Sequence, residues 1–243
     1  MNNYYTINCH RDNRMNEKRN QNTHNNYTKA YTIRKGVTEI YPYQFKNYKE
    51  LRKVHIPNSV TKIGKGAFYD CKRLSAINIP KSVNIINDCC FSFCYSLTSV
   101  TIPNSVVDLG KTCFSYCKNL ETVKLSDELS VINERTFYNC ESLKHLRLPN
   151  KCERIHKHAF LNCYSLQSVT IPTTVKFIDR EAFFNCCNLK YIITDNELIQ
   201  PGKFGIPNEC VILPNKFLVV WVHILKPYII AAIIIIIILI LII

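Results

Sequence analysis

A cysteine recurs at a constant interval of 23 residues, and this interval constrains the fold more than any other feature of the chain. A phenylalanine precedes each of these cysteines by three positions, and a leucine follows it by three. The columns are Cys71, Cys94, Cys117, Cys140, Cys163 and Cys186; Phe68, Phe91, Phe114, Phe137, Phe160 and Phe183; and Leu74, Leu97, Leu120, Leu143, Leu166 and Leu189. A fixed period of about 20 to 50 residues is typical of stacked units that share one continuous core. The chain is therefore predicted to fold as a repeat solenoid.

Two apolar patterns within each repeat predict two extended segments. In the first clear unit, alternation at Ile77 and Ile79 indicates a strand with one buried face, and Pro80 ends it because proline has no amide hydrogen to donate. Val60 and Ile63 predict a second, shorter extended segment, and the following GAFYDC favours a short helical or 3-10 turn. We therefore expect one parallel β-strand per repeat. The predicted strand centres are Ile77, Val100, Val123, Leu146, Val169 and Ile192.

One column holds the residue types that best tolerate a positive φ, which predicts a left-handed turn in every unit. Its members are Gly64, Asn87, Gly110, Asn133, His156 and Asp179.

The repeat register also sets the expected boundaries of the segments. Residues 1–32 are polar and poor in aliphatic side chains, so we expect a disordered arm. The solenoid is predicted over 33–193, with a divergent N-terminal cap repeat at 33–55 and six clear repeats at 56–193. Residues 194–216 are expected to form a degenerate C-terminal cap and linker, in which VILP is the candidate for one last strand.

The final segment, residues 217–243, is almost wholly apolar. A run of isoleucine without a polar face has nothing in so small a chain to bury all its sides against, and its length suits a hydrocarbon core of about 30 Å. We therefore predict a C-terminal transmembrane helix that anchors the chain in a membrane. Lys216 and Lys226 flank its N-terminal side, and positive flanks stay cytosolic, which favours cytosolic repeats.

The recurring pattern IPxSVxxIGxxAFxxCxxLxxVx resembles the BspA-like subfamily of leucine-rich repeats, which has 23-residue units. It occurs here as IPNSVTKIGKGAFYDCKRLSAIN and as IPNSVVDLGKTCFSYCKNLETVK, and six copies agree. The resemblance implies an arc with one parallel strand per repeat. It also implies a surface antigen, adhesin or other protein-recognition role, and no enzymatic activity.

The chain has 13 cysteines, but a disulfide framework is not expected. The polar N-terminus lacks the apolar core of a secretory signal, and most of the cysteines fall in core columns. We therefore expect free, buried thiols in a reducing compartment. Cys89 and Cys187 fall in columns of larger polar residues and are expected to be exposed.

The formal net charge is +13, yet the basic residues are scattered and form no dense run, so no nucleic-acid partner is expected. The sequence has no C-x-x-C pair and no glycine-rich phosphate loop. His145, His156 and His158 are the only histidine cluster and should lie on different faces. We therefore predict no metal, no cofactor and no catalytic residue.

The outward positions of the strands remain as the candidate partner-binding face, because solenoids commonly bind ligands on such faces. Small hydroxyl residues there are equally explained by strand preference alone. Lys124, His145 and Arg147 form a basic patch, and Tyr191 with Ile193 forms an apolar end. The candidate residues are Lys53, His55, Asn78, Thr101, Lys124, His145, Arg147, Thr170 and Tyr191.

The sequence thus predicts a non-catalytic protein-interaction module, tethered to a membrane by its C-terminus, that binds a protein ligand on the strand face. Two placements stay open. One is a cytosolic, tail-anchored scaffold, and the other is a cell-surface antigen or adhesin exported by an unrecognised route. An enzyme is a third class that no constellation of residues supports.

Overall fold

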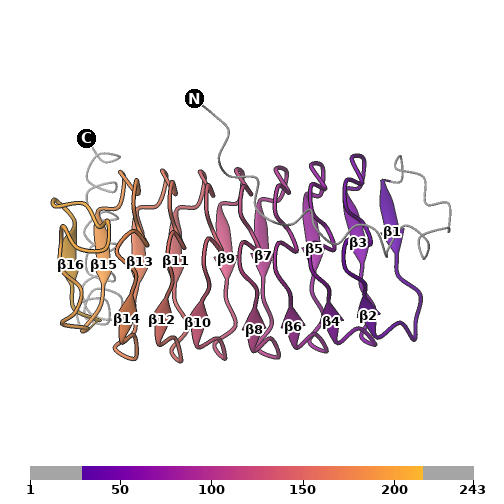
Figure 1. The fold of residues 1–243 in the computed structure, drawn as a ribbon, viewed down its shortest axis with the longest axis horizontal. Coiled ribbons are helices and arrows are strands. Elements are labelled where there is room, and N and C mark those ends of the chain that lie inside the picture. The colour runs from indigo at the N-terminus through magenta and orange to yellow at the C-terminus, as the bar shows by residue number, and fades with distance from the viewer. Residues whose placement is uncertain (1–28, 216–243) are drawn as a thin grey trace, which may run out of the picture.

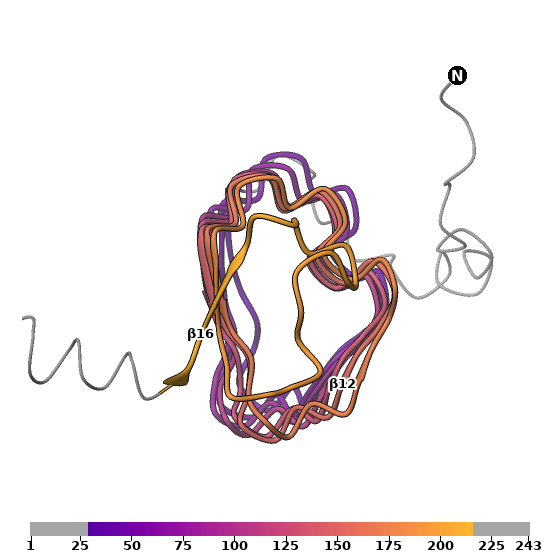
Figure 2. The ribbon, with the colours of Figure 1, turned by 90° about the vertical axis from the view of Figure 1, so that its left-hand side faces the viewer.

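The computed structural model describes residues 29–215, which form a stack of similar coils in a nearly straight row (Figure 1). The straight row differs from the arc that the resemblance implied. Each coil contributes one three-residue strand to a first layer and, in most coils, one two-residue strand to a second layer. Figure 2 shows the coils along the stack, with the two layers on different sides of a shared interior.

The first layer consists of parallel strands whose residues pair at the repeat interval, as between Lys53 and Ala76. Two hydrogen-bonded sheets, β1-β3-β5 and β7-β9-β11-β13-β15-β16, follow one another along the stack. All six predicted strand centres are confirmed. The strands are β1 (Ala30–Thr32), β3 (Lys53–His55), β5 (Ala76–Asn78), β7 (Ser99–Thr101), β9 (Thr122–Lys124), β11 (His145–Arg147), β13 (Ser168–Thr170), β15 (Tyr191–Ile193) and β16 (Val211–Leu213).

The second layer confirms the shorter extended segment that the Val60–Ile63 pattern predicted. Its strands are also parallel, and they form sheets in the orders β2-β4-β6-β8 and β10-β12-β14. The strands are β2 (Glu39–Ile40), β4 (Lys62–Ile63), β6 (Ile85–Ile86), β8 (Asp108–Leu109), β10 (Val131–Ile132), β12 (Arg154–Ile155) and β14 (Phe177–Ile178).

The segment from the second layer back to the first is made of turns. No helix occurs between residues 29 and 214, so the predicted short helical or 3-10 element is wrong. Alternate amides here bond to the next coil rather than along the chain: Gly66 N to Asp88 O at 2.8 Å and Phe68 N to Cys90 O at 2.9 Å. These cross-coil bonds interrupt the i to i+3 series that a helical turn needs.

Left-handed backbone occurs in every clear coil, but at other positions than the predicted column. The residues with positive φ are Gly66, Cys89, Thr112, Arg135 and His158, and four residues later Asp70, Phe93, Tyr116, Asn139, Asn162 and Asn185. The predicted column instead lies against the preceding coil. A Cβ added at Gly64 would lie 2.6 Å from Pro42 N, and one at Gly110 would lie 2.3 Å from Asp88 N. Glycine is required at these two positions by close backbone approach rather than by φ.

Two ladders run through the interior. The rings of the phenylalanine column, extended by Phe45, stack on one another with centroids between 5.0 and 5.7 Å apart. Each cysteine of the cysteine column donates its S–H to the carbonyl oxygen of the phenylalanine in the preceding coil, as from Cys71 to Phe45 at 3.0 Å. Each of these carbonyls also accepts the backbone amide three residues on, so the cysteine column adds a second hydrogen bond to it as well as filling space.

All cysteines of the described residues are free. Cys187 is exposed, as predicted, but Cys89 is buried, which contradicts the prediction. The Cys89 thiol lies 2.9 Å from the Thr112 hydroxyl. The position accepts a small side chain because its neighbours in the column include Gly66 and Thr112, which are also buried.

The stack begins earlier than the sequence indicated. Strand β1 lies within the segment assigned to the polar arm, because Ala30–Thr32 pairs with β3 and the Tyr31 ring packs edge-on against Phe45 at 4.9 Å. At the other end, β16 follows β15 by 20 residues in register, since Tyr191 pairs with Val211. The remaining arm and the apolar segment 217–243 lie outside the described residues. No described helix is long and apolar enough to cross a membrane.

Candidate functional site

The strand face consists of the outward side chains of the nine first-layer strands that the structure describes. The middle residue of each strand points inward, as with the buried Val54 and Leu146, so the two flanking side chains point outward. All nine candidate residues predicted from the sequence lie on this face. Thr170 is half-buried there, and the other eight are exposed.

The pairing of the strands brings the residues of the predicted basic patch close together. Lys124 pairs in register with Thr101, and Arg147 pairs with Thr170 one coil further on. His145 lies between them in sequence on β11, and its Nδ1 is 2.8 Å from the Ser168 hydroxyl. The patch therefore presents two permanent cations on adjacent strands, whose backbones lie about 4.8 Å apart.

The strand face carries no carboxylate. None of its nine described strands contains Asp or Glu. Among residues 29–215, neither Lys124 nor Arg147 forms an ion pair, and the guanidinium of Arg147 reaches only the amide oxygen of Asn150, at 3.4 Å. The face therefore holds cations whose charge no neighbouring side chain neutralises.

Carboxylates lie just beside this face and are already paired. Glu121, directly before β9, forms an ion pair with Lys144 at 2.8 Å. Glu50 pairs in the same way with Arg73 of the next coil. Such pairs link equivalent positions of adjacent coils, so the repeat itself brings them together.

The two ends of the strand face differ in the side chains that they expose. At the C-terminal end, Tyr191 and Val211 are 45% and 48% exposed, which extends the predicted apolar end onto β16. At the N-terminal end, His55 and Asn78 border a cavity of about 570 Å³ together with Lys35 and Lys81. The sequence analysis missed Lys35 and Lys81 because they lie in turns, outside the strand columns.

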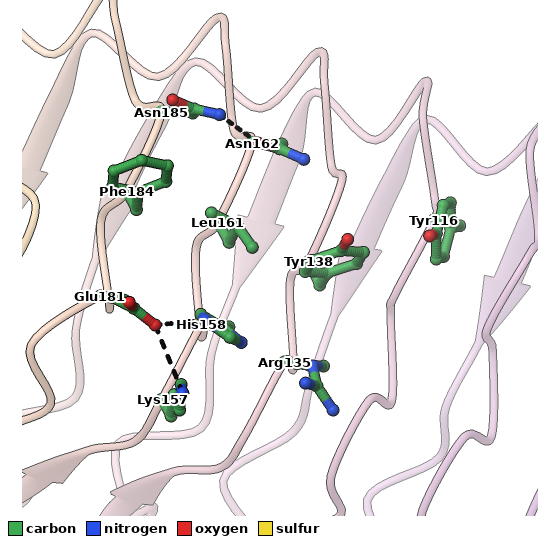
Figure 3. A pocket seen from close by; sticks show the side chains of 10 residues that line it. All are labelled: Tyr116, Arg135, Tyr138, Lys157, His158, Leu161, Asn162, Glu181, Phe184 and Asn185. Carbon is green, nitrogen blue, oxygen red and sulfur yellow. Dashed lines mark hydrogen bonds and ion pairs between the residues drawn. The ribbon is translucent and has the colours of Figure 1, made fainter. Parts of the chain in front are cut away.

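A second cavity, of about 430 Å³, lies on the turn face, which we define as the outward side chains of residues 134–139, 157–162 and 181–185 with Tyr116 (Figure 3). His158 Nε2 donates a hydrogen bond to the Glu181 carboxylate at 2.7 Å, and Lys157 reaches the same carboxylate at 3.4 Å. The hydrogen bond with His158, and then that with Lys157, hold the pKa of Glu181 below its usual value.

The sequence analysis did not predict the turn-face cavity, although a signal was present. The column that reads Gly66, Cys89 and Thr112 in the early coils changes to Arg135, His158 and Glu181 in the later ones. Small side chains in this column are buried, whereas the three long polar ones line a hollow.

The three histidines of the predicted cluster do not assemble into a single site. His145 lies on the strand face, His156 is 3.6 Å from Asp179, and His158 borders the turn-face cavity. No group of three or more His, Cys, Asp or Glu side chains gathers within residues 29–215 in a way that would hold a metal ion.

Comparison with known families identifies this architecture. The model of the BspA type leucine rich repeat region, in six copies, matches residues 19–144 and 84–205. The chain belongs to the BspA-type leucine-rich repeat family. Members of this family are in general non-catalytic repeat scaffolds, and this chain is a leucine-rich repeat protein of the protein-interaction type.

Two solved leucine-rich repeat structures share the fold. A leucine-rich repeat protein of Treponema pallidum is 28% identical with a TM-score of 0.64, over 67% of this chain and 78% of that one. A leucine rich cell surface protein of Faecalibacterium prausnitzii is 26% identical with a TM-score of 0.51, over 69% of this chain. The match spans 60% of the Faecalibacterium protein's own length. No curated protein matches this chain.

Proposed function

We propose that this chain is a non-catalytic interaction module that binds an acidic segment of a partner protein on the strand face. The observation that carries the proposal is the charge of that face. It presents Lys53, Lys124 and Arg147 without a carboxylate on any of its described strands. The ion pairs that neutralise lysine and arginine elsewhere leave Lys124 and Arg147 available.

The chemistry of the face suits recognition of an extended acidic chain. Parallel strands place equivalent side chains about 4.8 Å apart, so the face presents regular rows of short hydroxyl groups between the cations. Opposite charge raises the rate of encounter and fixes the register of the partner, while the hydroxyls offer uncharged hydrogen bonds. Attraction of this kind weakens when salt shortens the Debye length.

The test is a binding titration of the full chain with a short fluorescent polyglutamate peptide. The double substitution Lys124→Glu with Arg147→Glu should weaken binding strongly at low salt, and the difference should shrink at about 1 M salt, where the Debye length is about 3 Å. The matched control is Lys65→Glu with Lys111→Glu, because these two lysines occupy one column in the turns.

Two results would overturn the proposal. One is loss of peptide binding in the control variant but not in the strand-face variant. The other is tighter binding of a duplex oligonucleotide of equal charge, since a protein ligand is proposed and nucleic acid is not.

We further propose that residues 217–243 tether the module to a membrane and that the repeats face the cytosol. Support comes from the long apolar run and from Lys216 and Lys226 on its N-terminal side. Carbonate extraction of cell membranes tests the tether: the full chain should stay in the pellet, and a chain ending at residue 214 should not. Recovery of the full chain in the supernatant would refute the tether.

A cell-surface antigen or adhesin is the second candidate, favoured by the description of the Faecalibacterium relative as a cell surface protein. Protease added to intact cells distinguishes the two placements. Protection of the repeats supports the cytosolic scaffold, and cleavage supports the surface protein.

A further inference from the structure

The turn-face cavity differs in character from the strand face, and its three columns have separate roles (Figure 3). One column supplies apolar groups, one supplies amides, and one supplies charged or ionisable groups. The columns are Tyr138, Leu161 and Phe184; Asn162 and Asn185, next to Tyr116; and Arg135, His158 and Glu181, with Lys157 beside them.

The cavity exists because the repeats diverge at this point. In the early coils the space beside the equivalent column is filled, and a Cβ at Gly66 would lie only 2.4 Å from the Tyr43 ring. Cys89 and Thr112 are buried in the following two coils. From Arg135 onward the side chains are long and polar, and they border the hollow instead of filling it.

The apolar column offers a ring surface to the solvent. Phe184 is 51% exposed, although Phe183 beside it in sequence is fully buried in the interior ladder. Leu161 and Tyr138 are half-buried and continue this surface into the preceding coils. An exposed ring that borders a cavity is a ready surface for an apolar face of a ligand.

The amide column forms a hydrogen-bonded chain in which some donor and acceptor groups remain unused. Asn162 Nδ2 donates to Asn139 Oδ1 at 2.6 Å, and Asn185 Nδ2 donates to Asn162 Oδ1 at 2.9 Å. Within residues 29–215, the Asn185 Oδ1 atom is then left as an acceptor without a partner. Each amide also keeps a second N–H, since a carboxamide has two.

The charged column is nearly balanced. His158 forms a hydrogen bond and Lys157 an ion pair with the same oxygen of Glu181, Oε2. Among the described residues, Oε1 of Glu181 therefore remains available as an acceptor. Arg135 pairs with Glu134 at 3.0 Å. The cavity therefore offers donors and acceptors without a strong net charge, in contrast to the strand face.

We propose that the turn-face cavity binds one or two sugar units of a neutral glycan. A pyranose ring has one face of C–H groups, which fits against Phe184, and a rim of hydroxyls, which fits the free acceptors of Glu181 and Asn185. A phosphate or an acidic peptide would meet the Glu181 carboxylate, and a cationic ligand would meet Lys157. The cavity volume of about 430 Å³ lies in the range of small-molecule sites.

The test is saturation-transfer NMR of the full chain with four neutral trisaccharides, built from glucose, galactose, mannose and N-acetylglucosamine. At least one should receive saturation, mainly on ring C–H protons. Phe184→Ala should weaken its binding at least about tenfold, because an aromatic anchor carries much of the energy of such a contact. Glu181→Gln should weaken it by a smaller factor.

Phe177→Ala is the matched control. Phe177 is also a half-exposed phenylalanine, at 45%, but it lies on β14 outside the cavity, so its replacement should leave sugar binding unchanged. Melting curves of Phe184→Ala and Phe177→Ala should coincide closely, since both altered side chains are exposed. Equal loss of binding in Phe177→Ala and Phe184→Ala would overturn the site.

Two other outcomes would overturn the proposal: no saturation of any of the four trisaccharides, or displacement of a bound sugar by the polyglutamate peptide, which would make the cavity a peptide site. The proposal is separable from the strand-face function. Lys124→Glu with Arg147→Glu should leave sugar binding intact, whatever it does to peptide binding.

Discussion

The strand face and the turn face are built from the same repeat, but their side chains are used differently. At the positions of the early coils that are equivalent to the turn face, side chains contact one another. Phe93 and Tyr116 stack at 4.6 Å between centroids, and the Lys46 ammonium lies 5.2 Å from the Tyr43 ring and 5.5 Å from the Tyr69 ring. On the strand face, Lys124 and Arg147 have no such partner among the described residues.

The difference between the two faces indicates which part of a repeat protein is free to bind a ligand. Where the members of a column pair with their neighbours one coil away, these interactions stabilise the stack itself. Where the members of a column carry like charge, or only short hydroxyls, their charges and hydrogen-bonding groups remain available to another molecule. The interior ladders are the extreme of the first kind, and Lys124 with Arg147 are the extreme of the second.

High pH should produce the largest effect, through the buried thiols of the interior. Burial raises the pKa of Cys71 to about 12, and it raises the pKa of the five other column thiols. In the unfolded chain these thiols ionise near pH 9, so the unfolded state then binds fewer protons than the folded state. The stabilisation is complete below that pH and is lost as the pH rises, by up to about 1.4 kcal/mol per thiol and pH unit.

Denaturant unfolding between neutral pH and about pH 10.5 measures this slope. A variant with Cys117→Ala and Cys140→Ala should show a shallower fall, because two of the ionising thiols are gone. A free energy of unfolding that does not change above pH 9 would contradict the burial of the column.

Phe114→Ala should cost about 3–5 kcal/mol of stability, because Phe114 is fully buried and stacks on Phe91 and Phe137. Chemical denaturation measures the loss. Thr101→Ala on the strand face is the control, and it should change stability by no more than about 0.5 kcal/mol. Similar losses in both variants would remove the distinction between the interior and the strand face.

Gly110→Ala should cost about 1–3 kcal/mol, because the added Cβ would meet the backbone of Asp88 and the two coils would have to separate. The same substitution at Gly36, where nothing lies within 4 Å of an added Cβ, isolates the cost of a positive φ. Thermal melting of both variants separates steric contact from backbone strain. A Gly110→Ala protein as stable as the original would show that the coils are not in contact there.

The ion pair between Lys144 and Glu121 should contribute only about 0.2–1 kcal/mol, since both side chains are half-exposed. A double-mutant cycle with Lys144→Ala and Glu121→Ala measures the coupling, which should vanish at about 1 M salt. A coupling that persists in high salt would mean that the pair is shielded from solvent.

The sequence predicted the parts of the fold that follow from equivalence between repeats. Periodicity identified the strand centres, the phenylalanine ladder and the outward positions of residues such as Lys124 and Arg147, because each of these is the same in every coil. It did not predict the positive φ of Phe93 and Tyr116, because bulky residues seldom adopt this conformation; here their rings stack on each other.

The turn-face cavity escaped prediction for the opposite reason. It arises where the repeats differ, at Arg135, His158 and Glu181, and a consensus pattern averages such differences away. The burial of Cys89 was missed in the same manner, because its two neighbours in the column, Gly66 and Thr112, are small, whereas the later members are long and polar.

The most direct test of the account is an acetylation footprint of the lysines of the full chain, with and without the polyglutamate peptide. We predict that the peptide protects Lys53 and Lys124 on the strand face and leaves Lys65 and Lys111 in the turns as reactive as before. Equal protection of all four lysines, or protection of Lys65 and Lys111 alone, would show that the strand face is not the binding surface.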